Sequence, residues 1–468
     1  MLLLLFFFFF FFFNIPHPNF TTSIAASAAI ITHLPGFDGA LPFHLETGYV
    51  TVDEEKGSEY FYYFVESERN PSEDPLLLWL IGGPYCSGFN AFASTFGPVR
   101  LFSDSNNSSS LPNLAYNPYA WTKISSIIFL DWPIGTGFAF SKNAEAYTSD
   151  DLLSSKQIYI FIKKWFEVYP HFVSNSFFVG GDSYGGKLVP VVVQEIVQGN
   201  EGCKQQLVNI KGFLMGNPII QGQLNMKSQV TQAHRLGIIS DELLMMIENN
   251  CAGNDYGHPD DAICSLNLRI FKEFLSEINE GNVVEPLCDK QPVRTKELVE
   301  LNRFSMEYST ELIRMPSVTE TMCAETPAVL ADKWANNALT RKVLAIKEET
   351  VEKWLECRFD LNYTANIPSS APSFCNLLAR GYRALVYSGD HDLLSPYVGT
   401  LKWIKSLEFS KLEEWRSWHV GGQVAGYTVL FSNNLTFATV KGGSHTPADH
   451  LPMQCFAMFQ RWISDEVL

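Results

Sequence analysis

Gly180-Gly181-Asp182-Ser183-Tyr184-Gly185-Gly186 decides the fold of this chain. An apolar run at 176–179 precedes it and a stretch of helical character, 187–197, follows it. The order strand, sharp turn, helix with G-x-S-x-G at the turn is typical of a nucleophile elbow, whose glycines let the chain turn tightly and expose the serine hydroxyl. Ser183 is therefore the candidate nucleophile. A bare G-x-S-x-G also occurs in ordinary glycine-rich turns, so the partners of the serine decide the interpretation.

A serine hydroxyl needs an adjacent base, which a third group orients, and in this fold the chain order is Ser, then Asp or Glu, then His. The apolar strand predicted at 382–387 ends in a turn that carries Asp390 and Asp392, and the strand predicted at 435–440 runs into a glycine loop with His445. Spacing alone leaves both aspartates open as the orienting acid. Three catalytic residue types at three strand ends, in the expected order, favour covalent serine catalysis.

With these residues in place, the chain resembles the serine carboxypeptidase-like family, a branch of the α/β-hydrolase fold that includes carboxypeptidases and plant acyltransferases. The resemblance covers nearly all of the chain from about Leu34. It rests on Pro75-Leu76-Leu77-Leu78-Trp79-Leu80-Ile81-Gly82-Gly83-Pro84-Tyr85-Cys86-Ser87, Ile128-Phe129-Leu130-Asp131-Trp132-Pro133-Ile134-Gly135-Thr136-Gly137-Phe138, Gly181-Asp182-Ser183-Tyr184-Gly185-Gly186, Gly389-Asp390-His391-Asp392 and Gly442-Gly443-Ser444-His445.

The resemblance assigns roles within the site. It implies that Asp392 completes the triad with Ser183 and His445. It also implies that the backbone amides of Gly83 and Tyr184 form the oxyanion hole, in which each N–H donor contributes about 2.7 to 4 kcal/mol. No C-x-x-C motif occurs, so the sequence does not support a zinc or thioredoxin-like site, and we predict no cofactor and no metal.

Departures from the peptidase pattern select the predicted reaction. Family peptidases carry Asn-Gly-Gly at Ile81-Gly82-Gly83 and Glu before the serine, and these groups bind the free carboxylate of a peptide. Ile81 has no donor and Asp182 replaces the Glu. The plant acyltransferases share this replacement, and they move a hydroxycinnamoyl or benzoyl group from a 1-O-glucose ester to an alcohol or amine. The resemblance therefore implies such an acyltransferase, with Ile81, Gly82 and Asp182 contacting substrate.

Two alternatives stay open. The same triad would serve a serine carboxypeptidase or esterase, because transfer and hydrolysis differ only in whether an acceptor or water attacks the acyl enzyme. The second alternative is a catalytically inactive binding protein, because the residues at three further positions differ from the family pattern. Tyr85 replaces a glycine whose site could demand a backbone that side chains resist, Thr95 replaces a glutamate, and Ser444 replaces a glycine.

The N-terminus and the sequons indicate the secretory route. Residues 2–13 are an unbroken apolar run, too short for the roughly 20 residues of a membrane span, and Ala26-Ser27-Ala28 is a small-residue cleavage pattern. We predict a signal peptide over 1–28, no stable membrane span, and a vacuolar or extracellular destination. N-x-Ser or N-x-Thr sequons mark Asn106, Asn107, Asn362 and Asn434 as glycosylation sites; that at Asn19 would leave with the signal.

The nine cysteines suit an oxidising compartment, and their odd number leaves at least one thiol free. Sequence does not give their connectivity. The family pattern implies the pairs Cys86 with Cys357, Cys251 with Cys264, and Cys288 with Cys323, which leaves Cys203, Cys375 and Cys455 as thiols.

Composition and pattern shifts set the remaining expectations. A net charge of −16 argues against nucleic-acid binding, which requires a basic face. The G-x-x-x-x-G-K pattern at 181–187 is followed by Leu188, so the Ser or Thr of a nucleotide site is absent. Strands alternate with helices from 29 to 215, stop over a mostly helical, cysteine-bearing stretch at 216–335, and resume at 336–468. We therefore predict an α/β-hydrolase core with a mostly parallel sheet, helices on both faces and an inserted helical lid at 216–335. Oligomeric state is not indicated.

Overall fold

The computed structural model describes residues 28–103, 111–202, 208–219, 222–288 and 326–468. Within these residues, twelve strands form one sheet in the order β1-β2-β3-β7-β4-β10-β11-β13-β16-β15-β14, with β8 beside β3. Its middle is parallel and its two flanks are antiparallel. The parallel strands are β7 (Ser126–Asp131), β4 (Leu76–Leu80), β10 (Phe177–Asp182), β11 (Ile210–Gly216), β13 (Arg383–Gly389) and β16 (Leu435–Val440). The α/β-hydrolase fold predicted from the sequence is confirmed.

The flanks complete the sheet. One side carries β1 (Ala29–Ile31), β2 (Leu45–Asp53), β3 (Ser58–Val65) and β8 (Phe140–Ser141), and the other β15 (Gln423–Phe431) and β14 (Arg416–Val420). The β14–β15 hairpin was not expected from the sequence. Its turn is Gly421-Gly422, with φ of +57° and +75°, and two such residues are the usual requirement of a two-residue hairpin. This glycine pair could have revealed it.

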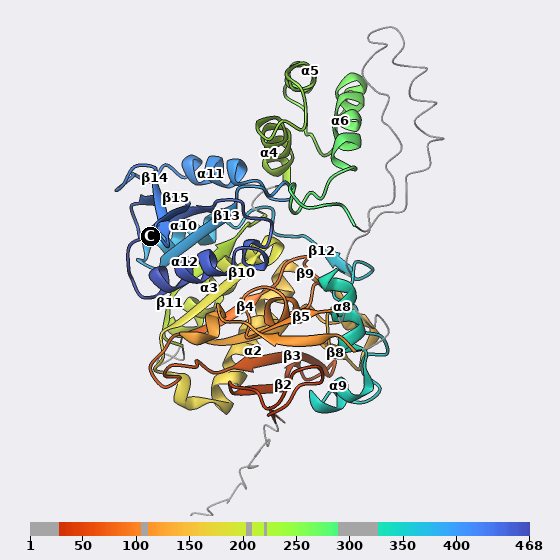
Figure 1. The fold of residues 1–468 in the computed structure, drawn as a ribbon, viewed down its shortest axis with the longest axis vertical. Helices are drawn as coiled ribbons and strands as arrows, with labels where there is room; N and C mark the ends of the chain where they lie inside the picture. The colour runs from red at the N-terminus through yellow and green to blue at the C-terminus, as the bar shows by residue number, and fades with distance from the viewer. Residues whose placement is uncertain (1–27, 104–110, 203–207, 220–221, 289–325) are drawn as a thin grey trace, which may run out of the picture.

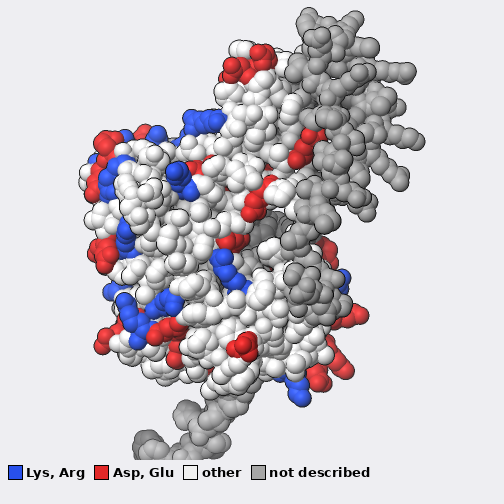
Figure 2. All heavy atoms as spheres, viewed as in Figure 1, with Lys and Arg blue, Asp and Glu red and all other residues white. Residues whose placement is uncertain are grey.

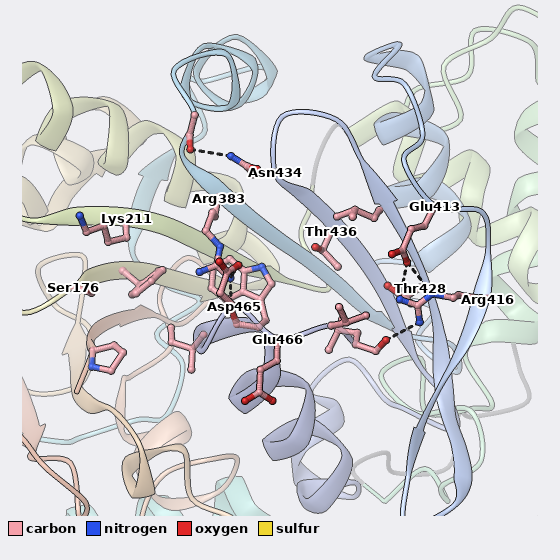
Figure 3. Close-up of a pocket in the computed structure, with 18 residues that line it drawn as sticks. Ser176, Lys211, Arg383, Glu413, Arg416, Thr428, Asn434, Thr436, Asp465 and Glu466 are labelled. Carbon is pink, nitrogen blue, oxygen red and sulfur yellow. Dashed lines mark hydrogen bonds and ion pairs between the residues drawn. The ribbon is translucent and has the colours of Figure 1, made fainter. Parts of the chain in front are cut away.

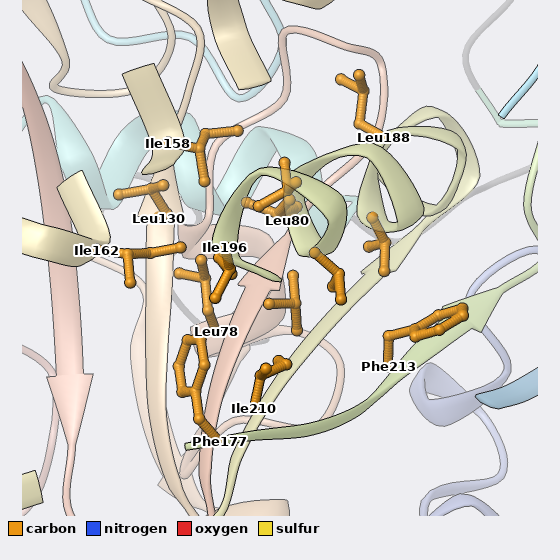
Figure 4. Close-up of a cluster of buried hydrophobic side chains, with 14 of the residues drawn as sticks. Leu78, Leu80, Leu130, Ile158, Ile162, Phe177, Leu188, Ile196, Ile210 and Phe213 are labelled. Carbon is orange, nitrogen blue, oxygen red and sulfur yellow. The ribbon is translucent and has the colours of Figure 1, made fainter. Parts of the chain in front are cut away.

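Helices cover both faces of the sheet, because parallel strands are apolar on both sides. On one face, α2 (Asp151–Val168), α3 (Ser183–Glu201), α10 (Ala371–Ala379) and α11 (Tyr397–Ser406) contribute to one buried cluster. Figure 4 shows Ile158 and Ile162 of α2 and Leu188 and Ile196 of α3 packed over Leu78 and Leu80 of β4. On the other face lie α1 (Phe89–Ala93), α8 (Pro327–Ala335) and α12 (Pro452–Ile463).

Between β11 and β13 the chain leaves the sheet. It first forms α4 (Gly222–Arg235), α5 (Asp241–Asn250) and α6 (Ala262–Leu275), which project from one end of the core (Figure 1) and share a separate buried cluster. α8 and α9 (Ala338–Val343) then pack on the core. Helix α6 begins at Ala262, where the Asp261 side chain caps it by accepting from the Cys264 amide at 2.8 Å.

The remaining features are the lack of a membrane-spanning helix among the described residues, the surface charges and two small sheets. In the part of the chain that the structure describes, no helix is long and apolar enough to cross a membrane. Acidic and basic side chains are interspersed on the face shown in Figure 2. Small sheets pair β5 (Val99–Phe102) with β6 (Asn113–Tyr116) and β9 (Thr148–Asp150) with β12 (Asn362–Thr364).

Candidate active site

Ser183 lies at the sharp turn between β10 and α3. Its φ is +54°, a left-handed conformation that few non-glycine residues adopt, and it is only partly buried, whereas Asp182 before it and Gly185 after it are buried. Helix α3 begins at Ser183 itself, four residues before the helical stretch expected from the sequence. A left-handed, partly buried serine between a buried strand and a helix is the backbone geometry of a nucleophile elbow.

The predicted acid and base are in contact. His445 follows β16 and Asp392 follows β13, and the His445 Nδ1 lies 2.8 Å from the Asp392 Oδ2. Burial lowers the pKa of the His445 imidazole, but the charge and hydrogen bond of Asp392 raise it, and the net shift of this pKa is upward. The bond at Nδ1 leaves Nε2 for proton transfer, which is the arrangement that a general base requires.

Neighbouring groups fix Asp392 and separate it from Asp390. Asp392 is fully buried and accepts from the Asn217 side chain at 2.8 Å and from the amides of Leu394 at 2.8 Å and Ser395 at 3.2 Å. Asp390 instead accepts from the amide of Gly442 at 2.7 Å, so it holds the loop that carries His445. The structure therefore gives the two aspartates, which spacing could not separate, different partners.

Asn217 was not anticipated from the sequence. It follows β11, is fully buried, and adopts a φ of +39°. Its side chain donates to Asp392 and accepts from the amide of Gly389, at 3.2 Å. A lone Asn after a strand carries no motif, and only its position, at the carboxyl end of a strand next to the elbow strand, could have suggested it.

The end of the inserted segment contacts both triad loops. The Glu280 carbonyl accepts from the Leu393 amide at 2.9 Å, the Gly281 carbonyl from the His445 amide at 2.7 Å, and the Val283 amide donates to the His391 carbonyl at 3.3 Å. These backbone bonds join residues far apart in sequence, so no local pattern could predict them. The insert thus helps to hold the acid and the base in place.

The loop after β4 lies against the elbow. A Cβ on Gly82 would stand 2.6 Å from the Ser183 Cβ and 2.8 Å from the Tyr184 nitrogen, so only glycine permits this approach. Gly83 has a φ of +113°, whereas Tyr85 is not among the residues with positive φ. The suspected conflict at Tyr85 is therefore wrong, because Gly83 carries the strained conformation. Ser444 also has no positive φ and is buried without strain of this kind.

A narrow cavity is lined by Asp182, the residue before Ser183, and by His445. Its described lining is Trp79, Thr95, Phe96, Asp182, Tyr387, His445, Thr446, Pro447 and Ala448. The Asp182 carboxylate accepts from the Trp79 indole at 2.8 Å, and burial raises the pKa of Asp182 to about 6 although that bond and the charge of His445 oppose the rise. The Thr95 hydroxyl donates to the Ala91 carbonyl at 3.4 Å, and Ile81 is buried in the apolar core.

Tyr184 points away from that cavity. Its hydroxyl donates to Asp151 at 2.7 Å, as does the hydroxyl of Tyr363 at 2.9 Å, and Lys187 lies 3.3 Å from the same carboxylate. Asp151 is fully buried at the start of α2. These bonds hold the Tyr184 ring, and with it the residue whose amide is the predicted oxyanion donor.

Three further carboxyl groups have raised pKa values; Asp131 is fully buried, and Glu356 and Asp449 are partly buried. Burial raises the pKa of Asp131, at the end of β7, to about 7, against the bonds that it accepts from Phe138, Ser87 and Gly88. Burial likewise raises the pKa of Glu356 and of Asp449 to about 7. These groups are neutral in mildly acidic solution and become charged near neutral pH.

Two predicted disulfides are present, Cys86–Cys357 at the loop after β4 and Cys251–Cys264 in the insert. Cys288 is also disulfide-bonded, and its predicted partner Cys323 lies outside the described residues. Cys375 and Cys455 are free thiols, as expected, and Cys203 lies outside the described residues. Covalent cross-links of this kind fit a protein of the secretory route.

A second cavity, of about 660 Å³, lies at the opposite, amino edge of the parallel strands. Figure 3 shows Arg383 beside Asp465 and Arg416 beside Glu413 in its wall. Its lining includes Asn434, a predicted glycosylation site, and none of the predicted catalytic, oxyanion-hole or substrate-binding residues.

Comparisons with known proteins agree with this architecture. The chain is 41% identical to serine carboxypeptidase-like 3 of Arabidopsis thaliana over 446 residues, which cover 95% of this chain and 94% of the relative. It is 40% identical to serine carboxypeptidase-like 16 of the same plant, over 96% of each chain. The solved structure of the prohormone-processing carboxypeptidase Kex1Δp of Saccharomyces cerevisiae is similar in fold, with a TM-score of 0.71, 19% identity, and coverage of 93% of this chain and 94% of that one. The family model of the serine carboxypeptidases matches residues 35–465, and the chain therefore belongs to the serine carboxypeptidase family.

Proposed function

We propose that this member of the serine carboxypeptidase family is an acyltransferase, which moves a hydroxycinnamoyl or benzoyl group from a 1-O-glucose ester to an alcohol or amine. One observation carries the proposal: the cavity beside His445 offers no grouping that would hold the free carboxylate of a peptide. Asp182 is already bonded to Trp79, the Thr95 hydroxyl is bonded to the Ala91 carbonyl of α1, and Ile81 has no side-chain donor. An unpaired carboxylate in such a site would be costly.

The cavity lining supports the same conclusion. Among its described residues, none is Lys, Arg, Asn or Gln. Arg100 lies behind the wall, where its guanidinium donates to the carbonyls of Thr95 at 3.1 Å, Ala448 at 2.7 Å and Asp449 at 3.0 Å. A neutral sugar or alcohol would enter this cavity at lower cost than a carboxylate, because no charge would need a partner.

The mechanism uses Ser183, His445 and Asp392. The Ser183 Oγ bonds to the ester carbonyl carbon while its proton passes to the His445 Nε2, and the Gly83 and Tyr184 amides stabilise the oxyanion. The bond from carbon to glucose oxygen breaks, and His445 returns the proton to that oxygen. An acceptor hydroxyl or amine then loses its proton to His445 and attacks the acyl carbon, and the proton returns to the Ser183 Oγ. Asp392 keeps the imidazole oriented throughout.

The proposal also gives the insert a role as a lid and the sequons a role as glycosylation sites. Residues 216–335 act as a lid that excludes water in favour of the acceptor, through the bonds of the 280–283 segment to the triad loops. Asn362 and Asn434 are exposed and carry glycans in a vacuolar or secreted protein. The proposed signal peptide and the sequons at Asn106 and Asn107 lie outside the described residues.

The test offers purified full-length protein a panel of 1-O-glucose esters with alcohol and amine acceptors, beside blocked dipeptides. The expected result is acylated acceptor and free glucose, with the Ser183→Ala protein as the blank. Release of C-terminal amino acids at a rate that rivals ester turnover would assign peptidase activity instead. An activated serine reagent is expected to label Ser183 in the native protein, and its failure to do so would favour the inactive binding protein.

A further inference from the structure

The two sequence neighbours of Ser183 direct their side chains to different places. Asp182 bonds to Trp79 and lines the cavity with His445, whereas Tyr184 bonds to Asp151, and its ring meets that of Tyr363 at 5.9 Å. In acyl transfer, one imidazole gives a proton to the leaving group and takes a proton from the acceptor. Both groups must therefore bind on the cavity side, and the acyl group extends to the other side, toward Tyr184.

Tyr85 lies on this other side. It follows the predicted oxyanion donor Gly83 by two residues, and a Cβ on Gly83 would stand 2.5 Å from the Tyr85 nitrogen. Electrostatic interaction with Tyr85 is also among the causes that, after burial and Asp151, raise the pKa of Tyr184. The Tyr85 ring meets the ring of Phe359 edge to face, with 5.4 Å between centroids. Phe359 is 75% exposed, although it is a large apolar side chain in contact with Tyr85 of the loop after β4. An exposed ring of this kind gains stability when an apolar ligand covers it.

The backbone beneath both rings is fixed. The Cys86–Cys357 disulfide links the residues next to Tyr85 and near Phe359, the Arg358 amide donates to the Tyr85 carbonyl at 2.9 Å, and the Ser87 amide donates to the Glu356 carbonyl at 2.8 Å. Arg358 and Asp360, on either side of Phe359, pair with each other at 2.8 Å. A platform that is ordered before the ligand arrives loses less entropy on binding.

We propose that Tyr85 and Phe359 form an aromatic shelf that binds the ring of the transferred acyl group and selects aromatic over aliphatic acyl donors. The inference rests on the proposed function for its natural donor, and on the acyl enzyme alone for its geometry. It also explains the residue at position 85. A glycine would satisfy the backbone there, so the tyrosine side chain is present for what its ring contacts.

A purely structural role for Phe359 would need burial, and its 75% exposure shows that the fold covers little of it. Phe102, 45% exposed on β5, is a matched control because it is also an exposed phenylalanine and takes no part in the cavity or the shelf.

The experiment compares nitrophenyl cinnamate with nitrophenyl butyrate, and cinnamoyl glucose with butyryl glucose, in wild type, Phe359→Ala, Tyr85→Leu and Phe102→Ala. The readout is the ratio of kcat/KM for the aromatic to the aliphatic ester, which does not depend on the fraction of active protein. Loss of an apolar contact is expected to lower this ratio about tenfold in Phe359→Ala and Tyr85→Leu. Phe102→Ala should keep the wild-type ratio.

The outcomes separate the shelf from the acyltransferase proposal. Unchanged ratios in both shelf variants, or an equal fall in Phe102→Ala, overturn the shelf whether or not glucose esters react. If glucose esters fail as donors while the nitrophenyl ratio falls in the shelf variants, the shelf stands and the glucose-ester proposal is wrong. A wild-type enzyme that prefers butyrate to cinnamate also overturns the shelf.

Discussion

The two edges of the parallel sheet both carry charged side chains, but these side chains form surface ion pairs at one edge and a buried cluster at the other. At the amino edge (Figure 3), Arg383 pairs with Asp465 at 3.1 Å and Arg416 with Glu413 at 2.7 Å, and these groups neutralise each other at the surface. At the carboxyl edge, Asp392 is fully buried and bonded to His445. Loops after parallel strands converge at that edge, which is where ligands bind in such folds. The comparison indicates that burial and convergence, and not the presence of charge, distinguish a reactive edge from a structural one.

The largest expected effect is at Ser183. Ser183→Ala removes the only proposed nucleophile and should lower kcat for ester turnover by about 10⁵ to 10⁶. The Ala side chain keeps the Cβ at a φ of +54°, so the stability of the fold should barely change. Steady-state kinetics and thermal unfolding of the same preparation check both statements. Turnover within tenfold of wild type would place the reactive group elsewhere.

The second effect compares the two aspartates of one turn. Asp392→Asn should lower kcat by about 10⁴, because the amide cannot hold the His445 imidazole in the required tautomer. Asp390→Asn should lower it less than about tenfold, because Asp390 holds the Gly442 amide and the His391 ring, 2.8 Å away, rather than His445, and a side-chain carbonyl can still accept from an N–H. Equal losses in the two variants would contradict the assignment of Asp392 as the acid.

These two positions also show what sequence reasoning could reach. The parallel strands were predictable because strands buried on both faces are continuous apolar runs, and Ser183 and His445 followed from their glycine loops at strand ends. Asp392 could not be separated from Asp390 by spacing, because the choice depends on a contact with a loop 53 residues away. Asn217 and the carbonyls of Glu280 and Gly281 belong to no local motif, since their partners come from distant strands.

The third effect concerns pH and the carboxyl edge as a whole. The pKa values of Asp131, Glu356 and Asp449 rise to about 7 and that of Asp182 to about 6. A carboxyl whose folded pKa is raised contributes stability below its ordinary pKa near 4, and this is lost as pH rises through the folded value. The raised pKa of His445 acts in the same direction, because its contribution is present below about 6.5 and is lost as pH rises through the folded value.

The free energy of unfolding should therefore fall by on the order of a few kcal/mol between about pH 5 and pH 8. Urea unfolding at these two pH values measures this change in the free energy of unfolding. Greatest stability in acidic solution would suit a protein of an acidic vacuole. Asp74, whose pKa is lowered, stays charged across this window and supplies no opposing slope. A urea midpoint that increases toward pH 8 would show that the buried carboxylates do not dominate.

The smallest expected effect is at the amino edge, where Arg416 also donates to the Leu468 carbonyl at 2.6 Å. Arg416→Ala should cost at most about 1 kcal/mol of stability, because a partly exposed ion pair is screened by solvent. Ester turnover should equal that of wild type, since the sheet separates this residue from the triad. A double-mutant cycle with Glu413→Ala isolates the pair from the other contacts of each side chain. If Arg416→Ala instead lowered kcat/KM by tenfold without a loss of stability, the amino edge would be coupled to the active site, and the distinction drawn between the two edges would fail.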